Sequence, residues 1–181
     1  MTPRSAKVVI LCEDDQQEAF IRQFLKVWAR NWEPIRTNKN RSPGGSGEQW
    51  VREQFPAELQ AHRSREKRGR SVLIVMTDAD KFKVSQRAKQ LLKECEKTAV
   101  DAPRENEAVV IAIPKWSVET WLRYLDGQEF DENKQTAPHY SLVASKKPAR
   151  SLAAMCKSNK LRAPAPKSLE LVCDGFKTLF K

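Results

Sequence analysis

The chain has 181 residues and a formal net charge of +10 at pH 7, because 33 Lys and Arg outnumber 23 Asp and Glu. This length fits one domain with a sizeable core, and the positive charge favours a polyanionic partner, nucleic acid before an anionic membrane. No apolar stretch approaches the roughly 20 residues of a membrane span and no signal peptide is recognisable, so we expect a cytoplasmic protein that makes no membrane contact.

The first predicted element is a strand over residues 7–12, an unbroken apolar run that three acids follow. Apolar side chains at helical spacing then predict a helix that reaches Trp28, and a weak strand signal lies around Ile35. Three of the six glycines stand in the loop 42–47, which we interpret as a connector. The loop lacks the Lys-Ser or Lys-Thr that ends an ATP-binding phosphate loop, so ATP hydrolysis by this chain is not expected.

The next helix is expected from Glu48 past Leu59, with Pro56 as a kink or a break, and its tail is strongly basic. That tail leads into residues 71–76, a second apolar run without polar alternation. Such runs are typical of strands that are buried on both faces of a parallel sheet. An amphipathic helix over residues 84–95 follows it.

A third buried strand is expected at residues 108–113, and a helix begins after it near Val118. Strands and helices that alternate with short connections predict a mostly parallel α/β sheet flanked by helices and wound by right-handed crossovers. The four cysteines form no C-x-x-C motif, which favours reduced thiols over zinc ligands or disulfides.

Beyond the α/β pattern of residues 1–126 the composition changes. No acid occurs between Asn133 and Leu169, whereas eight Lys and Arg do. We expect residues 127–181 to form a small basic helical extension packed on the core. Two helices are predicted within it: residues 148–157 and 168–180.

Acids directly follow two of the buried strands: Glu13 the first, and Asp78 and Asp80 the central one. The carboxyl ends of parallel strands meet at the edge where ligands bind. Two acids at i and i+2 in extended backbone point the same way, and a cation relieves their repulsion. The pattern therefore predicts one or two Mg²⁺ or Mn²⁺ ions held by these three carboxylates. The alternative for Asp80 is the N-cap of the next helix.

Further candidates flank these strand ends. Glu119 opens the helix after the third strand and would complete the catalytic site, although acids in a first helical turn also stabilise the helix dipole alone. Lys81 and Lys115 stand just beyond strand ends. There they would contact phosphate or stabilise a transition state, or they would be ordinary solvated lysines.

Two basic groups are candidates for contacts with a nucleic-acid backbone, with a merely solvated surface as the alternative. Mixed charges are usual on a surface that serves solubility alone, and the long acid-free stretch departs from this. Acids that collect a metal need surrounding bases to hold the polyanion that they would otherwise repel. Besides Lys81, the candidates are Arg63, Arg65, Lys67, Arg68, Lys146, Lys147 and Arg150.

A Glu at the end of the first strand and an Asp-x-Asp at the end of a later one resemble the TOPRIM domain of topoisomerases, primases and overcoming-lysogenization-defect nucleases. The matching residues are Glu13 in Val-Ile-Leu-Cys-Glu and the pair in Val-Met-Thr-Asp78-Ala-Asp80. The segment that begins Ile113-Pro-Lys-Trp and the segment Pro166-Lys-Ser-Leu are similar to small TOPRIM-like proteins of prokaryotic antiphage systems. The resemblance covers about residues 7–125.

The resemblance implies a TOPRIM-like, Rossmann-like fold and a Mg²⁺- or Mn²⁺-dependent endonuclease that cleaves DNA or RNA, with Glu13 as metal ligand or as general acid/base. It also implies an antiphage effector, with an ATPase or another defence protein as a partner. Two positions depart from the family pattern, because Asp14 stands where Gly is common and Gln17 where a second Glu is common. The alternative is therefore a catalytically silent module that binds nucleic acid or a partner protein through its basic surface.

Overall fold

The computed structural model describes residues 6–29, 32, 34–42, 44–135 and 140–179. Strands and helices alternate along the first part of the chain, and two further helices follow in the second. Their bounds are, in chain order, β1 (Lys7–Cys12), α1 (Asp15–Trp28), β2 (Ile35–Lys39), α2 (Gly47–Glu66), β3 (Ser71–Met76), α3 (Val84–Lys97), β4 (Val109–Ala112), α4 (Val118–Leu125), α5 (Lys146–Ser158) and α6 (Lys167–Thr178).

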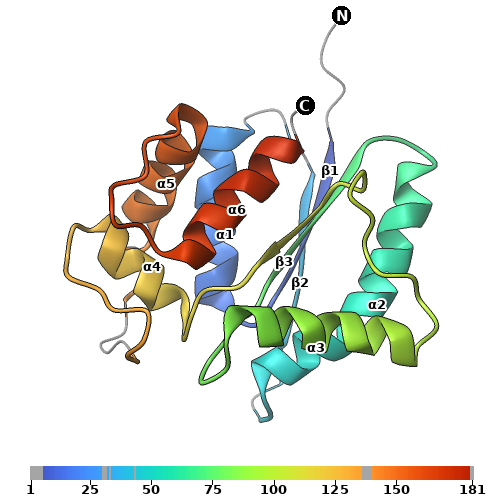
Figure 1. Ribbon diagram of the computed structural model, residues 1–181. Coiled ribbons are helices and arrows are strands. Elements are labelled where there is room, and N and C mark those ends of the chain that lie inside the picture. Colours follow the sequence, from blue (N-terminus) through green and yellow to red (C-terminus); the bar gives the residue numbers. More distant parts are fainter. Residues whose placement is uncertain (1–5, 30–31, 33, 43, 136–139, 180–181) are drawn as a thin grey trace, which may run out of the picture.

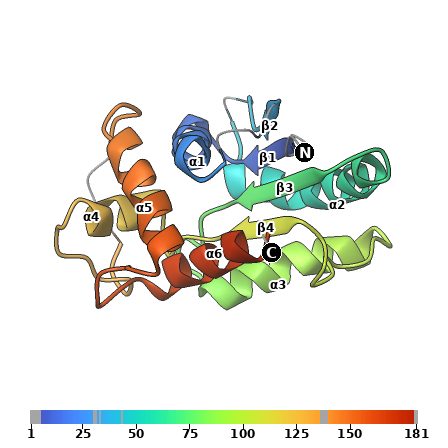
Figure 2. The same ribbon diagram turned by 90° about the horizontal axis from the view of Figure 1, so that it is seen from above.

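The four strands form one sheet in the order β2-β1-β3-β4, and every pair of neighbours is parallel (Figure 2). This confirms the predicted α/β class. The weak signal around Ile35 is also a strand, which pairs along β1 so that Lys39 lies beside Cys12. Its signal is weak because an edge strand is only half-buried and carries polar side chains among few apolar ones.

Two layers of helices cover the sheet, α1, α4, α5 and α6 on one face and α2 and α3 on the other (Figure 1). Successive side chains of a strand point to opposite faces, so β1 sends Ile10 into one apolar cluster and Leu11 into the other. Each cluster then needs its own helical cover. That is why the central strands, after their first residues, have apolar side chains at successive positions rather than at alternate ones.

A kink or a break is expected at Pro56, and helix α2 runs without interruption through it, so the prediction of a break is wrong. The side chains of Val51, Phe55 and Leu59 are fully buried against the sheet on both sides of the proline. Such packing of an apolar face supplies most of a helix's stability in a protein, and it outweighs the one hydrogen bond that proline removes. None of the helices in the described ranges is long and apolar enough to cross a membrane.

The two helices of the extension share a hydrophobic cluster with the sheet. Helix α5 packs along α1, where Arg150 donates to Gln23 Oε1 at 2.8 and 3.0 Å. From α6, the ring of Phe176 lies 4.4 Å from that of Phe24, centroid to centroid. Helix α6 ends at Thr178, and the last residue of the predicted helix, 180, lies outside the described part of the chain.

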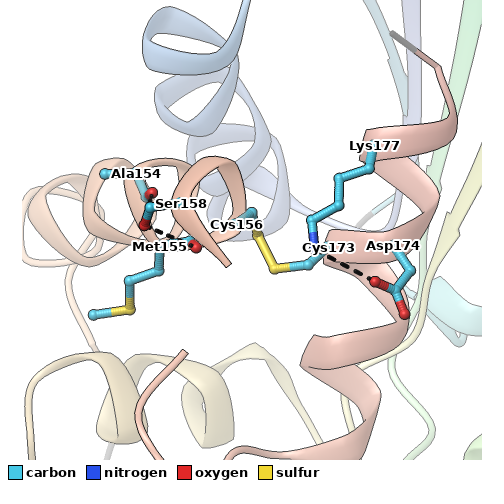
Figure 3. The surroundings of a disulfide bond; sticks show 7 residues. All are labelled: Ala154, Met155, Cys156, Ser158, Cys173, Asp174 and Lys177. Carbon is cyan, nitrogen blue, oxygen red and sulfur yellow. Dashed lines mark hydrogen bonds and ion pairs between the residues drawn. A yellow bond between two sulfur atoms is a disulfide. The ribbon is translucent and has the colours of Figure 1, made fainter. Parts of the chain in front are cut away.

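A disulfide between Cys156 and Cys173 joins α5 to α6 (Figure 3). The expectation of reduced thiols is therefore wrong for this pair, and it holds for Cys12 and Cys95, which are free and buried. The two bonded residues are 17 positions apart, and the packing of the two helices brings their Cα atoms to 5.1 Å. Such proximity depends on tertiary structure and cannot be read from cysteine spacing.

Candidate functional site

The structure brings Glu13 and Asp78 together where β1 and β3 end side by side. One carboxylate oxygen of Glu13, Oε1, accepts hydrogen bonds from the backbone N–H of Asp78 at 2.6 Å and from the hydroxyl of Thr77 at 2.7 Å. Leu11 pairs with Val75 in the preceding register, so these contacts follow from the parallel pairing of two neighbouring strands. Residues 65 positions apart thus form one local cluster.

Gln17 is a second bridge between the same strand ends. Its side chain is completely buried, accepts from the backbone N–H of Glu13 at 3.0 Å and donates to Asp78 Oδ1 at 3.0 Å. Asp14 caps α1 by accepting from two backbone N–H groups of its first turn, which fixes the start of that helix. The first turn of α1 therefore holds Gln17 against the end of β3.

Both carboxyls of the cluster titrate above their ordinary range. Burial raises the pKa of Asp78 well above normal, and the negative charges of Glu13, Asp14 and Glu119 raise it further. Burial also raises the pKa of Glu13, against two hydrogen bonds that lower it. No cationic side chain within the described ranges pairs with either group. Close carboxylates in this situation are stabilised by a bound cation.

Helix α2 begins against the Glu13 side chain. A Cβ atom added to Gly47, the first residue of α2, would lie 3.0 Å from Glu13 Cβ and 3.1 Å from Glu13 Oε2. A residue without a side chain is needed for this close approach. This close approach places the positive end of the α2 dipole beside the Glu13 carboxylate.

The backbone at Asp80 is not extended, although the i, i+2 pattern of Asp78 and Asp80 predicts that it is. Strand β3 ends at Met76, and Asp80 adopts a left-handed backbone with φ 49°. Its N–H donates to the carbonyl of Trp116 at 3.0 Å. Its carboxylate is largely exposed and pairs with Arg87 at 3.1 Å, and its charge still helps to raise the pKa values of Glu13 and Asp78. Asp80 does not cap α3, whose N-cap is Lys83.

Arg87 and Lys115 hold the loop that carries these acids. The guanidinium of Arg87 is buried and donates to the carbonyl of Asp78 at 2.9 Å, while its other nitrogens contact Asp80 and Glu48. The Lys115 ammonium donates to the carbonyls of Asp80 and Phe82 at 2.9 and 2.8 Å. Lys115 therefore supports the loop in this conformation instead of pointing a free charge toward a substrate.

The remaining acid and base beside the cluster are Glu119 and Lys81. Glu119 is buried in the first turn of α4, and its charge is near enough to help raise the pKa of Asp78. Lys81 is exposed, with its ammonium 5.7 Å from the centre of the Phe82 ring. Of the predicted phosphate contacts, Lys81 stands next to the acids in the loop and is open to solvent.

The first basic group lies far from the acids. Helix α2 begins at Gly47, beside Glu13, and is 20 residues or about 30 Å long. Its basic tail therefore lies at the amino-terminal ends of the strands. There Arg63 pairs with Glu107 at 2.6 Å and Arg65 with Glu58 at 3.5 Å. Lys67 and Arg68 are exposed at the same end.

The second basic group belongs to α5. Lys146 and Lys147 are exposed in its first turn, whereas the guanidinium of Arg150 is occupied by Gln23 of α1. Lysines at the start of this helix are thus open to a polyanion, and the arginine serves the packing of α5 on α1.

The donors at the cluster suit a hard cation, although they are few. Within the part of the chain that the structure describes, no group of three or more His, Cys, Asp or Glu side chains is arranged to hold a metal ion. Mg²⁺ is commonly bound by only one or two carboxylates, with water and substrate oxygens as its other ligands. Glu13 and Asp78 fit that pattern. Comparisons of the chain with protein-family models, curated proteins and solved structures find no match.

Three residues of the cluster carried no assigned role in the sequence. Gln17 could have been found, because it follows Glu13 by one helical turn. Gly47 could have been found as the last glycine before a helix. Arg87 gives no sequence signal, because its partners come from two other parts of the chain.

Proposed function

We propose that this chain is a divalent-metal-dependent nuclease with a TOPRIM-like fold, in which Glu13 and Asp78 hold Mg²⁺ or Mn²⁺. The observation that carries the proposal is the pair of carboxylates at adjacent strand ends, whose pKa values are both raised and which share no cationic partner in the described ranges. Maintaining such a pair costs stability, which a bound cation recovers. The charge of +10 supports a nucleic-acid substrate.

A metal at this site would neutralise charge on the phosphodiester and activate the attacking water. The chain's own groups orient its ligands. The Thr77 hydroxyl and the Asp78 N–H fix Glu13 Oε1, and the Gln17 amide fixes Asp78 Oδ1. Each carboxylate keeps one further oxygen for a cation.

Neighbouring residues have distinct parts in this proposal. Glu119 is a candidate for a general base, because its charge reaches Asp78. Lys81 is the candidate for a phosphate contact in the loop, and Lys146 and Lys147 extend the positive surface. Asp80 pairs with Arg87 through one oxygen and keeps the other, so it is a further candidate ligand. The antiphage role and a partner ATPase remain expectations from the resemblance.

The test is cleavage of a panel of labelled duplex DNA, single-stranded DNA and RNA with MgCl₂ or MnCl₂. We expect Asp78→Asn to abolish metal-dependent cleavage and to keep the helical circular dichroism of the wild type. The matched control is Asp174→Asn, which removes an exposed acid of α6 and should cleave normally. Full cleavage by Asp78→Asn would overturn the proposal.

A second candidate is the catalytically silent binding module. Two observations favour it: Asp80 is paired with Arg87, and the Lys115 ammonium is occupied by loop carbonyls. This candidate predicts that the chain retards nucleic acid in a gel without added metal, shows no cleavage, and gains no thermal stability from MnCl₂.

A further inference from the structure

Among the residues that the structure describes, Gln17 is the one neutral side chain whose amide forms hydrogen bonds with both Glu13 and Asp78. It is completely buried in the first turn of α1. Its Oε1 accepts from the Glu13 backbone and its Nε2 donates to Asp78 Oδ1, each at 3.0 Å. Both the oxygen and the nitrogen of the side-chain amide are thus held by a hydrogen bond.

An amide suits this place for a chemical reason. The N–H of Glu13 needs an acceptor, and the charged oxygen of Asp78 needs a donor, so the bridging group must supply both. A glutamate of the same shape would keep the acceptor but would set a second negative charge against Asp78 Oδ1. Without a cation, that arrangement is repulsive.

The hydrogen bonds also determine how many oxygens remain for a metal. Glu13 Oε1 is taken by Thr77 and the Asp78 N–H, and Asp78 Oδ1 is taken by Gln17. One oxygen of each carboxylate remains, Glu13 Oε2 and Asp78 Oδ2, to which no donor in the described ranges is bound. Two carboxylate charges balance one divalent ion.

We propose that Gln17 is a positioning residue that couples Asp78 to the Glu13 turn and limits the site to a single divalent cation. The cation part rests on the proposed function, whereas the coupling does not. Replacing the amide by a carboxylate adds the charge and the oxygens that a second ion would use.

The coupling is tested without metal, by thermal unfolding in EDTA. We expect Gln17→Glu to lower Tm by about 5 °C, since it replaces an attraction by a repulsion. Adding Asp78→Asn in the same chain should restore most of the loss, because the asparagine amide then donates to the new carboxylate. An equal loss with Asp or Asn at position 78 would overturn the coupling.

The matched control for this cycle is Gln16→Glu. Gln16 belongs to the same helical turn and donates to a neutral partner, the carbonyl of Tyr140, at 2.9 Å. Its replacement also removes one amide donor but sets no charge against Asp78. We expect Asp78→Asn to raise the Tm of Gln16→Glu no more than it raises the Tm of the wild type, and to raise the Tm of Gln17→Glu by more than that. An equal rescue would show that the effect is general repulsion in α1, and would overturn the specific role of Gln17.

The ion count is tested by calorimetric titration of MnCl₂ into the full chain. We expect one Mn²⁺ per chain for the wild type and two for Gln17→Glu, whose Tm in MnCl₂ should rise back to the wild-type value. Two ions in the wild type, or one in Gln17→Glu, would overturn the single-cation limit. No binding to the wild type would overturn the metal part of the proposed function as well, and the cycle in EDTA would still decide whether Gln17 couples Asp78 to Glu13.

Discussion

The charged residues are paired differently at the two ends of the strands, the carboxyl-terminal ends (the carboxyl edge) and the amino-terminal ends (the amino edge). At the carboxyl edge, burial and neighbouring acids raise the pKa of Asp78. At the amino edge, two hydrogen bonds from Arg63, at 2.6 and 3.0 Å, lower the pKa of Glu107. Both edges carry many charged residues, and helix α2 connects them.

The charges at the amino edge have a structural explanation, whereas those at the carboxyl edge do not. Paired charges such as Arg63 and Glu107 need no ligand to explain them. A carboxylate pair with raised pKa values and no cationic partner in the described ranges is an unbalanced feature, and such features concentrate at functional sites. Glu13 and Asp78, rather than the long basic tail of α2, are therefore the candidate site.

The largest expected effect is the loss of cleavage when an acid of the carboxyl edge is replaced. We expect Glu13→Gln to lower metal-dependent cleavage by about 100-fold or more, because it removes a ligand or acid/base group. Glu107→Gln, the same change at the other edge, should leave the cleavage rate unchanged. The measurement is the initial rate on the best substrate of the panel. Similar losses in both variants would indicate a general defect of folding rather than of a site.

The approach of α2 to Glu13 gives the second prediction. We expect Gly47→Ala to weaken Mn²⁺ binding about tenfold, because a Cβ at 3.0 Å must displace either the helix or the carboxylate. Gly44→Ala is the control, since a Cβ there meets nothing within 4 Å. Both affinities are measured by calorimetry. Equal affinities would mean that the Glu13 side chain can shift freely.

The third prediction concerns stability in the absence of metal and has opposite signs at the two edges. Glu107→Gln should cost about 1–2 kcal/mol, because it weakens charge-assisted hydrogen bonds to Arg63. Asp78→Asn should stabilise the chain by about 1 kcal/mol, because it removes a poorly balanced buried charge. Urea unfolding in EDTA measures both. A loss in both variants would contradict the proposed imbalance.

The smallest expected effect is a pH dependence at the amino edge. Burial lowers the pKa of His62 to about 4, and the charges of Arg65 and Arg63 act in the same direction. A histidine whose folded pKa is depressed contributes stability that is complete above its unfolded value, 6.5, and is lost as the pH falls toward 4. Between pH 6.5 and pH 5 we expect His62→Gln to lose about 1 kcal/mol less than the wild type. Parallel urea curves across this range would rule the effect out.

Much of the fold could be predicted because three strands are continuous apolar runs that only a doubly covered sheet explains. The edge strand that begins at Ile35 gave a weak signal because it is only partly buried and has few apolar side chains. The break expected at Pro56 is absent because local propensity cannot weigh the packing of Phe55 and Leu59 against the sheet. The disulfide between Cys156 and Cys173 depends on how two helices meet, which spacing along the chain does not show.

The candidate site could be predicted in part. Glu13 and Asp78 meet because parallel neighbours end together. Asp80 departs from the pattern because its positive φ arises from a bridge to Trp116, itself at φ 64°, which is far away in the sequence. The carboxylate of Asp80 pairs with Arg87, in the next helix, and no local motif encodes this contact.

The bond between Cys156 and Cys173 has a practical consequence for all of these measurements. It closes a short loop that contains the link from α5 to α6, and closing a loop of this length contributes about 3 kcal/mol. Dithiothreitol in a purification buffer would therefore yield a less stable preparation than air oxidation does. Samples compared with one another should share the same thiol state, checked by mobility on a non-reducing gel.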